Sequence, residues 1–267
     1  MLLFFSDLDG TILDDRYDPG KAMEGIRLLR EAGIPLILIS SKTFEEMCPY
    51  HKCFSLDSPL VFENGGGIAL PRVSGPGFDL QITGAGIDEL ERAMPFLRDI
   101  LKEDLRTIRE MSIEEIVSLT GLPPEAAETA RVRRASLPFV LPSGRRVGTD
   151  ELREACLSLK AKALTVTRGA RFFHLHSLQI DKGRAALLIA DYYRKQAGAG
   201  FLRWAAAGDG ENDLPLLREA DYSCLIRRRD GIITEEGLDI PVTGAEGPEG
   251  FTEAVGLILE WAGRLKQ

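Results

Sequence analysis

The chain has 267 residues, of which 44% are hydrophobic and 28% are charged, and its formal net charge is −8. This composition is typical of a globular protein with one large domain, or with a core and an inserted domain. The acidic balance argues against nucleic acid or an anionic membrane as a partner, because both require a basic face. The locally clustered arginines are therefore expected to be solvated surface or loop charges; they are Arg131, Arg133, Arg134, Arg227, Arg228 and Arg229.

The lack of a recognisable targeting signal and the small number of cysteines predict a reduced, intracellular setting. The sequence has no run of about 18 apolar residues that would predict a transmembrane helix. Its first apolar stretch is short and lacks the basic flank of a signal peptide. The four cysteines are too few for a disulfide scaffold, and their spacing is not that of zinc ligands. We expect a cytoplasmic protein with free thiols. No pattern indicates its oligomeric state.

The first part of the chain alternates predicted strands and helices. Strands are expected at residues 2–5, 34–39 and 60–62, with an amphipathic helix at 20–32 and a short helix after residue 43. This alternation predicts a parallel sheet with right-handed crossovers.

The pattern changes between residues 84 and 176. Three helices are expected, at 86–103, 112–120 and 125–131, the second opening with a capping box from Ser112 to Glu115. Short strands are predicted at 139–141, 163–166 and 171–176, and the last alternates as a half-buried antiparallel strand does. These residues therefore predict an inserted α+β domain, with hinges expected at 84–86 and 176–180.

The strand and helix alternation then returns. Helices are expected at 181–193, 214–220 and 251–265, and strands at 204–207 and 222–226. The predicted fold class is α/β, with a Rossmann-like parallel-sheet core of residues 1–83 and 177–267 and an inserted domain of residues 84–176.

Two groups of acids follow predicted buried strands. Asp7 and Asp9 follow the first strand, and Asp209 and Asp213 follow a later one. Open α/β sheets bind ligands at the carboxyl ends of their strands, so these four carboxylates are expected to face one crevice. They would repel one another without a cation, and Mg²⁺ prefers such oxygen ligands. A turn would explain Gly10 alone, and a calcium-binding EF-hand loop would follow a helix.

Four short segments together resemble the motifs of the haloacid dehalogenase-like hydrolase superfamily. They are the two acid groups, Ser40 after the second strand, and Lys182 at the start of a late helix. The resemblance covers essentially the whole chain, and the domain inserted between the second and third motifs resembles the large α/β cap of subfamily IIB (Cof-type). It implies a Mg²⁺-dependent phosphatase that works through an aspartyl-phosphate.

The resemblance also implies roles for individual residues. Asp7 would attack phosphorus, and Asp9 would protonate the leaving oxygen and later deprotonate water. Ser40 would donate a hydrogen bond to the phosphoryl group, and Lys182 would offset negative charge. Ser41 is the alternative to Ser40, and Lys42 is the alternative source of positive charge.

The metal ligands implied by the resemblance are Asp7, the backbone carbonyl of Asp9, and Asp209. Asp213 would hold the water shell of the metal, and Asn212 would orient its loop or serve a structural role. Mg²⁺ is the implied cofactor.

The segments around Ser40–Ser41–Lys42, Asn64–Gly65 and Arg168–Arg171 resemble the mannosyl-3-phosphoglycerate phosphatase branch. The implied substrate carries a carboxylate and a sugar besides its phosphate, and hydrolysis would give mannosylglycerate. The implied substrate-binding residues are Ser41, Lys42, Asn64, Gly65, Arg168, Arg171 and Asn212. Arg168 and Arg171 would bind the carboxylate.

Simpler interpretations remain for several of these residues. The two arginines could be surface residues, Asn64–Gly65 could be a turn, and His174 and His176 are expected to pack rather than to bind metal. Gly210 stands where this branch is expected to have serine. Alternative functions are a generic sugar-phosphate or phosphoglycolate phosphatase, a phosphomutase, or a non-catalytic phosphosugar-binding protein, which would be expected to lack a motif acid.

Overall fold

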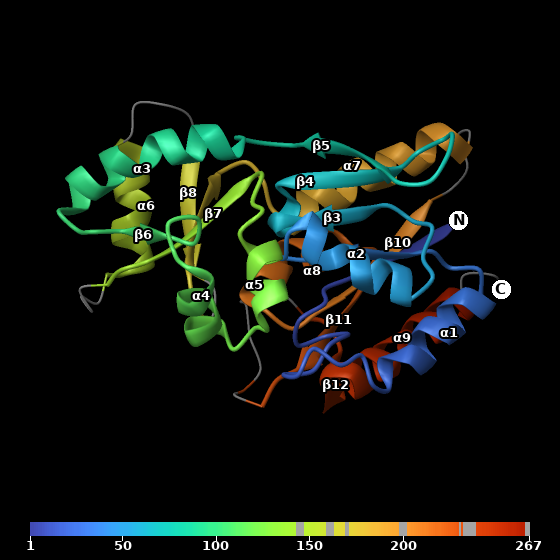
Figure 1. Cartoon of the computed structure of the whole chain (residues 1–267). Helices are drawn as coiled ribbons and strands as arrows, with labels where there is room; N and C mark the ends of the chain where they lie inside the picture. The colour runs from blue at the N-terminus through green and yellow to red at the C-terminus, as the bar shows by residue number, and fades with distance from the viewer. Residues whose placement is uncertain are drawn as a thin grey trace.

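The chain folds into two β-sheets, each with its own helices (Figure 1). The computed structural model describes residues 1–142, 147–158, 163–168, 171–197, 202–229, 231 and 239–264. The larger sheet has the order β12-β11-β10-β1-β2-β3-β4-β5. Its strands are β1 (Leu2–Ser6), β2 (Leu36–Ile39), β3 (Leu60–Phe62), β4 (Gly67–Pro71), β5 (Phe78–Ile82), β10 (Arg203–Gly208), β11 (Tyr222–Arg227) and β12 (Val242–Glu246).

Parallel pairing dominates the larger sheet and confirms the predicted α/β fold class. The strands from β12 to β3 are parallel, with β1 between β10 and β2. The hairpin of β4 and β5 adds two antiparallel strands at one edge. The sequence analysis missed β4, β5 and β12. The side chains of β5 are mostly exposed, so it lacks the apolar run by which buried strands are recognised.

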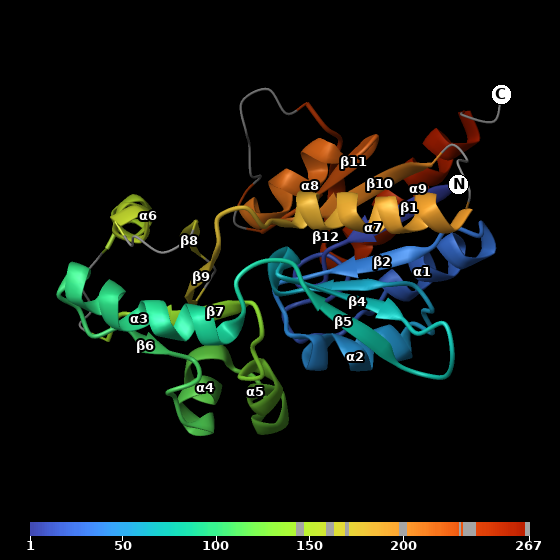
Figure 2. The same ribbon diagram turned by 90° about the horizontal axis from the view of Figure 1, so that it is seen from above.

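Helices cover both faces of the larger sheet (Figure 2). One face packs against α1 (Ala22–Glu31), α2 (Phe44–Cys53) and α9 (Gly247–Arg264), and the other packs against α7 (Lys182–Ala197) and α8 (Leu214–Glu219). The side chains of neighbouring residues in β1 point to opposite faces of the sheet, as strand geometry requires. The ring of Phe4 stacks on Phe251 of α9, whereas Phe5 meets Trp204 edge-on.

The second sheet is antiparallel and has the order β6-β7-β9-β8. Its strands are β6 (Arg106–Thr107), β7 (Ser136–Val140), β8 (Leu164–Arg168) and β9 (Phe173–Ser177). The associated helices are α3 (Ile87–Leu101), α4 (Ile113–Thr120), α5 (Pro124–Ala130) and α6 (Thr149–Ser158). The predicted capping box at Ser112 and Glu115 is confirmed. Helix α6 was not predicted, because only three of its residues are buried and its apolar pattern is weak.

The two faces of the second sheet differ in chemistry. Leu137, Val166 and Leu175 lie in register across three strands and pack into one core with α3 and α6. Alternate residues of the same strands point to the opposite face. This second surface is called the polar face; its residues are Ser136, Thr165, Thr167, His174 and His176.

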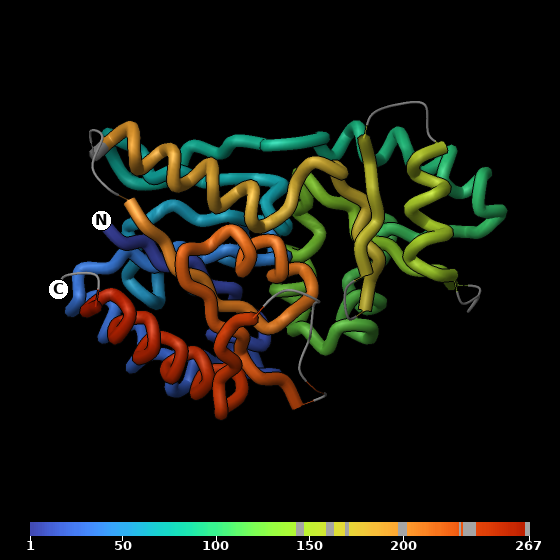
Figure 3. The backbone as a smooth tube through the Cα atoms, turned by 180° about the vertical axis from the view of Figure 1, so that it is seen from behind, coloured from blue at the N-terminus to red at the C-terminus, as the bar shows by residue number. Residues whose placement is uncertain are grey.

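The second sheet and its helices lie at the end of the molecule opposite both termini (Figure 3). The chain leaves the larger sheet between β5 and α3 and returns between β9 and α7. These two connections meet, since the amide of Ala85 donates to Ser177 Oγ at 2.6 Å. We propose, on this topology, a core of residues 1–83 and 177–267 and a cap of residues 84–176. In the described residues, no helix is both long and apolar enough to cross a membrane.

Gly65 yields a first prediction. Its φ is +97°, and a Cβ atom there would overlap the backbone carbonyl of Asp181, just before α7. We expect Gly65→Ala to lower the free energy of unfolding by about 2–4 kcal/mol, from backbone strain plus this overlap. Gly33 also has positive φ but has open space around it, so Gly33→Ala should cost only about 1 kcal/mol. Urea denaturation would measure both, and equal costs would contradict the prediction.

Candidate active site

Four adjacent parallel strands end side by side, and a polar side chain follows each of them. In sheet order, β10 leads to Asp209, β1 to Asp7, β2 to Ser40 and β3 to Asn64 through a short 3₁₀ helix, η1 (Glu63–Gly65). The carboxyl edge of the parallel sheet thus gathers residues as far apart in the chain as Asp7 and Asp209, as expected for this fold class.

Lys182 lies at the centre of this group. It is the first residue of α7 and is fully buried, with Nζ 2.8 Å from Asp7 Oδ1 and 2.5 Å from Asp213 Oδ1. Burial opposes its charge, but the two carboxylates outweigh burial and raise the pKa of Lys182 above its usual value. The two acids therefore favour the charged form of this ammonium group.

Asp213 has a second set of partners. Its Oδ2 accepts hydrogen bonds from the amides of Asp209, at 3.1 Å, and Gly210, at 2.9 Å. These bonds shape η2 (Glu211–Asp213) after β10. Asp213 therefore fixes the loop that carries Asp209 while it also pairs with Lys182.

Three carboxylates fit a divalent cation. Oxygens of Asp7, Asp209 and Asp213 lie within 4.8 Å of one another. Apart from the ion pair with Lys182, no hydrogen bond reaches the buried Oδ1 of Asp7 within the described residues. Burial and then the charge of Asp213 raise the pKa of Asp7, and the same two causes raise the pKa of Asp209 to about 7. A hard cation such as Mg²⁺ would stabilise all three charges.

Asp9 is not one of the three grouped carboxylates and pairs with a different lysine. Its Oδ1 lies 3.0 Å from Nζ of the buried Lys42, which also lies over the ring of Tyr17 at 4.7 Å. Burial opposes the charge of Lys42, but Asp9 and Glu46 raise its pKa. The sequence left Lys42 and Lys182 as alternatives. The structure places both at the site, each beside a different aspartate.

The Ser40 hydroxyl lies in the same buried region. Its Oγ accepts from the amide of Lys42 at 3.3 Å and donates to no group in the described part of the chain. Its hydrogen is therefore available to an oxygen of a ligand. Backbone hydrogen bonds tie the 40–42 turn to η1, from Asn64 to Ser40 and from Glu63 to Lys42. Ser41 uses its carbonyl to bind a cap residue, Arg133.

Asn64 and Asn212 join two of the loops. The amide Nδ2 of Asn212 donates to Asn64 Oδ1 at 3.0 Å, and both residues lie beside the carboxylate group. Gly65 lets η1 approach the start of α7. Serine was expected at position 210, but the structure favours glycine there. A Cβ atom at Gly210 would lie 2.5 Å from Asn212 Oδ1. Glycine at this position lets Asn212 occupy its observed place.

The structure does not bring Arg168 and Arg171 to the carboxylates. Arg168 belongs to the face of the second sheet that α3 and α6 cover, and its guanidinium lies 5.7 Å from the ring centre of Phe173. Arg171 is exposed in the β8–β9 connection. Both lie at the far end of this hairpin, since its opposite end, at Ser177, adjoins the core and bonds the other connection at Ala85. We assign neither arginine a substrate contact.

The expectation of solvated surface or loop charges is wrong for Arg133, and Arg134 and Arg228 have acidic partners. Arg133 is buried and donates from Nη1 to the carbonyl of Ser41 at 2.9 Å. Arg134 forms a bidentate ion pair with Glu45, in which Nη1 and Nη2 each lie 2.6 Å from a carboxylate oxygen. Arg228 lies 3.5 Å from Asp209. A local sequence pattern does not show which arginines a distant acid will partner.

Glu63 is a further residue that the sequence analysis did not single out. Its buried carboxylate accepts hydrogen bonds from the amides of Arg134, Ala135 and Ser136, and from Ser136 Oγ at 2.8 Å. Glu63 thus binds the start of β7 to the end of β3 and joins the cap to the core. An acid next to a Gly-rich turn was the only available signal.

The two histidines of the polar face differ in their contacts. The ring nitrogens of His176 bond the carbonyl of Ser177 at 3.0 Å and Thr167 Oγ1 at 3.2 Å. The Nδ1 atom of His174 is buried and has no hydrogen-bond partner in the described residues. Burial, with smaller contributions from Arg133 and His176, lowers the pKa of His174 to about 3. His174 is therefore neutral near pH 7.

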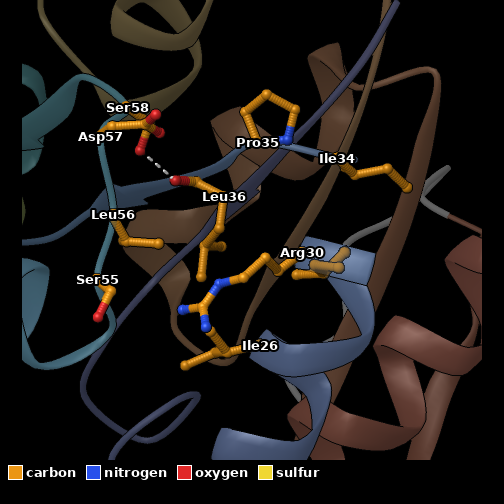
Figure 4. A pocket seen from close by; sticks show the side chains of 10 residues that line it. Ile26, Arg30, Ile34, Pro35, Leu36, Ser55, Leu56, Asp57 and Ser58 are labelled. Carbon is orange, nitrogen blue, oxygen red and sulfur yellow. Dashed lines mark hydrogen bonds between the residues drawn. The ribbon is translucent and has the colours of Figure 1, made fainter. Parts of the chain in front are cut away.

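A separate cavity of about 270 Å³ lies near the amino-terminal end of β2, opposite the end that carries Ser40 (Figure 4). It is lined by the end of α1, the start of β2 and the loop before β3, including Arg30, Leu36 and Asp57. Leu36 is the first residue of β2, whereas Ser40 follows its last, so the strand separates the cavity from the carboxylates by about 13 Å. The cavity therefore has no part in the site described above.

Comparison with known proteins decides the family. Residues 4–74 match the haloacid dehalogenase-like hydrolase family. The chain is also 30% identical, over 270 positions covering 97% of each sequence, to a Persephonella marina protein named glucosyl-3-phosphoglycerate/mannosyl-3-phosphoglycerate phosphatase. The chain belongs to the haloacid dehalogenase-like hydrolases. This membership and the name of the relative indicate a phosphoric monoester hydrolase.

Solved structures of the same superfamily share the fold. A haloacid dehalogenase-like hydrolase from Bacteroides thetaiotaomicron superposes with a TM-score of 0.69 at 19% identity, over 96% of this chain and 98% of that one. A sugar phosphatase of subclass IIB gives a TM-score of 0.65 at 15% identity, over 97% and 99%. The resemblance identified from the motifs is thus confirmed for family and fold.

The carboxylate group predicts stabilisation by magnesium. Mg²⁺ at about 100 times its dissociation constant should raise the free energy of unfolding by about 2.7 kcal/mol, because it binds only the folded chain. Asp209→Asn removes one ligand and should abolish most of this gain. Thermal unfolding of both proteins with and without MgCl₂ measures the effect, and an equal gain in the variant would place the metal elsewhere.

His174 predicts a pH dependence of stability. Its folded pKa lies below the unfolded value of about 6.5, so only the unfolded chain takes up this proton on mild acidification. Stability from this group is present above pH 6.5 and is lost as the pH falls toward 3. Between pH 7 and pH 5 the loss is about 2 kcal/mol. Urea denaturation should show a smaller loss in His174→Asn, and identical losses would disprove the assignment.

Proposed function

We propose that this protein is a Mg²⁺-dependent phosphatase that forms an aspartyl-phosphate and hydrolyses a glycosyl-3-phosphoglycerate, with mannosyl-3-phosphoglycerate as the first candidate. The observation that carries the chemistry is the buried group of Asp7, Lys182 and Asp213 beside Asp209. The observation that supports the substrate is the whole-length similarity to the Persephonella marina phosphatase.

In the first half of this proposed reaction, a carboxylate oxygen of Asp7 forms a bond to phosphorus as the ester P–O bond breaks. Asp9, two residues after Asp7, gives its proton to the departing oxygen of the substrate. Ser40 Oγ donates to a phosphoryl oxygen, and Lys182 offsets the charge between the phosphoryl group and Asp7.

In the second half, water attacks phosphorus and gives one proton to Asp9, and the bond between phosphorus and Asp7 breaks to release inorganic phosphate. Asp7, Asp209 and the backbone carbonyl of Asp9 would hold Mg²⁺, with Asp213 holding its water shell, and the ion would supply positive charge that stabilises the phosphoryl oxygens. Lys42 holds Asp9 near the site between the two steps.

The substrate assignment has one competing observation. Gly210 replaces the serine expected for the mannosyl-3-phosphoglycerate branch, as in generic sugar phosphatases. A sugar-phosphate or phosphoglycolate phosphatase is therefore the second candidate, and a phosphomutase would use the same aspartates. A cytoplasmic enzyme that acts on a small phosphorylated substrate, without nucleic acid or membrane partners, remains the expectation from the sequence.

Phosphate release from a panel of esters tests the proposal. The panel holds mannosyl-3-phosphoglycerate, its glucosyl analogue, mannose 6-phosphate and phosphoglycolate, each with and without MgCl₂. We expect Mg²⁺-dependent release that favours the glycosyl phosphoglycerates, and a loss in kcat on the order of 10³-fold or more in Asp7→Asn, which lacks the nucleophile.

Asp15 provides the matched control for this panel. It lies in the same loop with its side chain 89% exposed, so Asp15→Asn should leave kcat within about twofold. Broad activity without preference would remove the named substrate, isomerisation without phosphate release would favour the phosphomutase, and full activity of Asp7→Asn would refute the mechanism.

A further inference from the structure

The polar face of the cap sheet is directed toward the core. Helices α3 and α6 cover the opposite face, and the views in Figures 1 and 3 agree that the second sheet lies between α6 and the larger sheet. Ser136, at the near end of this face, donates from Oγ to Glu63, which follows β3 directly. The polar face therefore begins at the same edge that carries the carboxylates.

His174 lies on the same face of β9 as His176, two residues farther from the core. It is paired with Pro138 on β7 and with Thr167 on β8. Arg133 is near enough for its charge to act on the imidazole, and the same guanidinium binds the carbonyl of Ser41, next to Ser40. Arg133, whose charge acts on His174, thus also binds the turn that would hold the phosphoryl group.

The unmet hydrogen-bonding capacity of His174 points to a ligand. A buried polar atom without a partner costs about 1–3 kcal/mol, so native structures seldom keep one. The Nδ1 atom of His174 is such an atom among the described residues. A neutral imidazole offers one donor and one acceptor, which matches a hydroxyl group better than an anion.

We propose that His174 is a specificity-determining residue, which hydrogen-bonds through Nδ1 to a hydroxyl of the sugar part of the substrate. This inference rests on the proposed phosphatase function and deepens it. The phosphoryl group would bind at Ser40 and Lys182, and the sugar would extend toward the polar face. His176 belongs to the same face, but its two nitrogens already have partners, so it has no capacity left for substrate.

The test compares two esters that differ only in the sugar. Glucosyl-3-phosphoglycerate carries it and 3-phosphoglycerate does not, and p-nitrophenyl phosphate serves as a general ester. We expect His174→Phe to lower kcat/KM for the glucosyl ester by at least about 10-fold, because a lost hydrogen bond to a substrate hydroxyl is costly. The values for the two esters without sugar should stay within about threefold.

Two further variants separate recognition from folding. His174→Asn places an amide near the position of Nδ1 and should recover part of the lost kcat/KM on the glucosyl ester. His176→Phe removes bonds internal to the cap and should change all three esters by the same factor. A binding measurement accompanies these rates: glucosylglycerate, the product without phosphate, should inhibit p-nitrophenyl phosphate hydrolysis at least about 10-fold more weakly in His174→Phe than in the parent. His174→Asn should give an intermediate inhibition.

The outcomes separate this inference from the proposed function. Equal losses on all esters in His174→Phe, or no loss on the glucosyl ester, would overturn the role of His174. If the parent enzyme hydrolyses p-nitrophenyl phosphate but no glycosyl phosphoglycerate, the named substrate fails. The same variants are then compared on mannose 6-phosphate and glycerol 3-phosphate, where a selective loss on the sugar ester supports the inference and its absence overturns it.

Discussion

The ion pairs of Lys182 are the interaction on which the rest of the site depends. A buried lysine is stable only with charged partners, and buried carboxylates on adjacent strand ends are stable only with a cation. Lys182 meets both needs through Asp7 and Asp213. Glycines on both sides make this possible: Gly65 lets η1 reach the start of α7, and Gly183 lets α7 approach the backbone of Pro215. Removal of one partner would leave an uncompensated charge in the core.

The cap is attached to the core by polar groups rather than by a shared apolar core. The hydrophobic clusters of the cap are separate from those of the larger sheet. Glu63, Arg133 and Arg134 form the main links, together with Thr43, which donates to the carbonyl of Thr129. Polar contacts exchange with water at little net cost in free energy, so an interface of this kind is compatible with reversible opening. It also connects the Ser40–Lys42 turn directly to the cap residues beside His174.

Strongly apolar strands and well-capped helices were predictable, because their signals are local. The capping box of α4 and the buried strands β1, β2 and β10 are examples. Elements with exposed or irregular side chains, such as β5 and α6, gave no such signal. The arginines show the same limit for function: the sequence favoured Arg168 as a substrate ligand and classed Arg133 as a solvated charge. The strand register puts Arg168 on the face of the cap sheet that is directed away from the core, whereas Arg133 contacts Ser41.

The sequence by itself determined the fold class, the family, and the residue types of the catalytic motifs, because each motif is a short segment at the end of a strand or the start of a helix. Only the tertiary structure decided how these segments combine. It assigned Lys182 to Asp7 and Lys42 to Asp9, buried Glu63 at the junction of core and cap, and gave His174 Nδ1 no hydrogen-bond partner among the described residues. The reason is physical: ion pairs and hydrogen bonds form between segments far apart in the chain, and their geometry is set by sheet order and register.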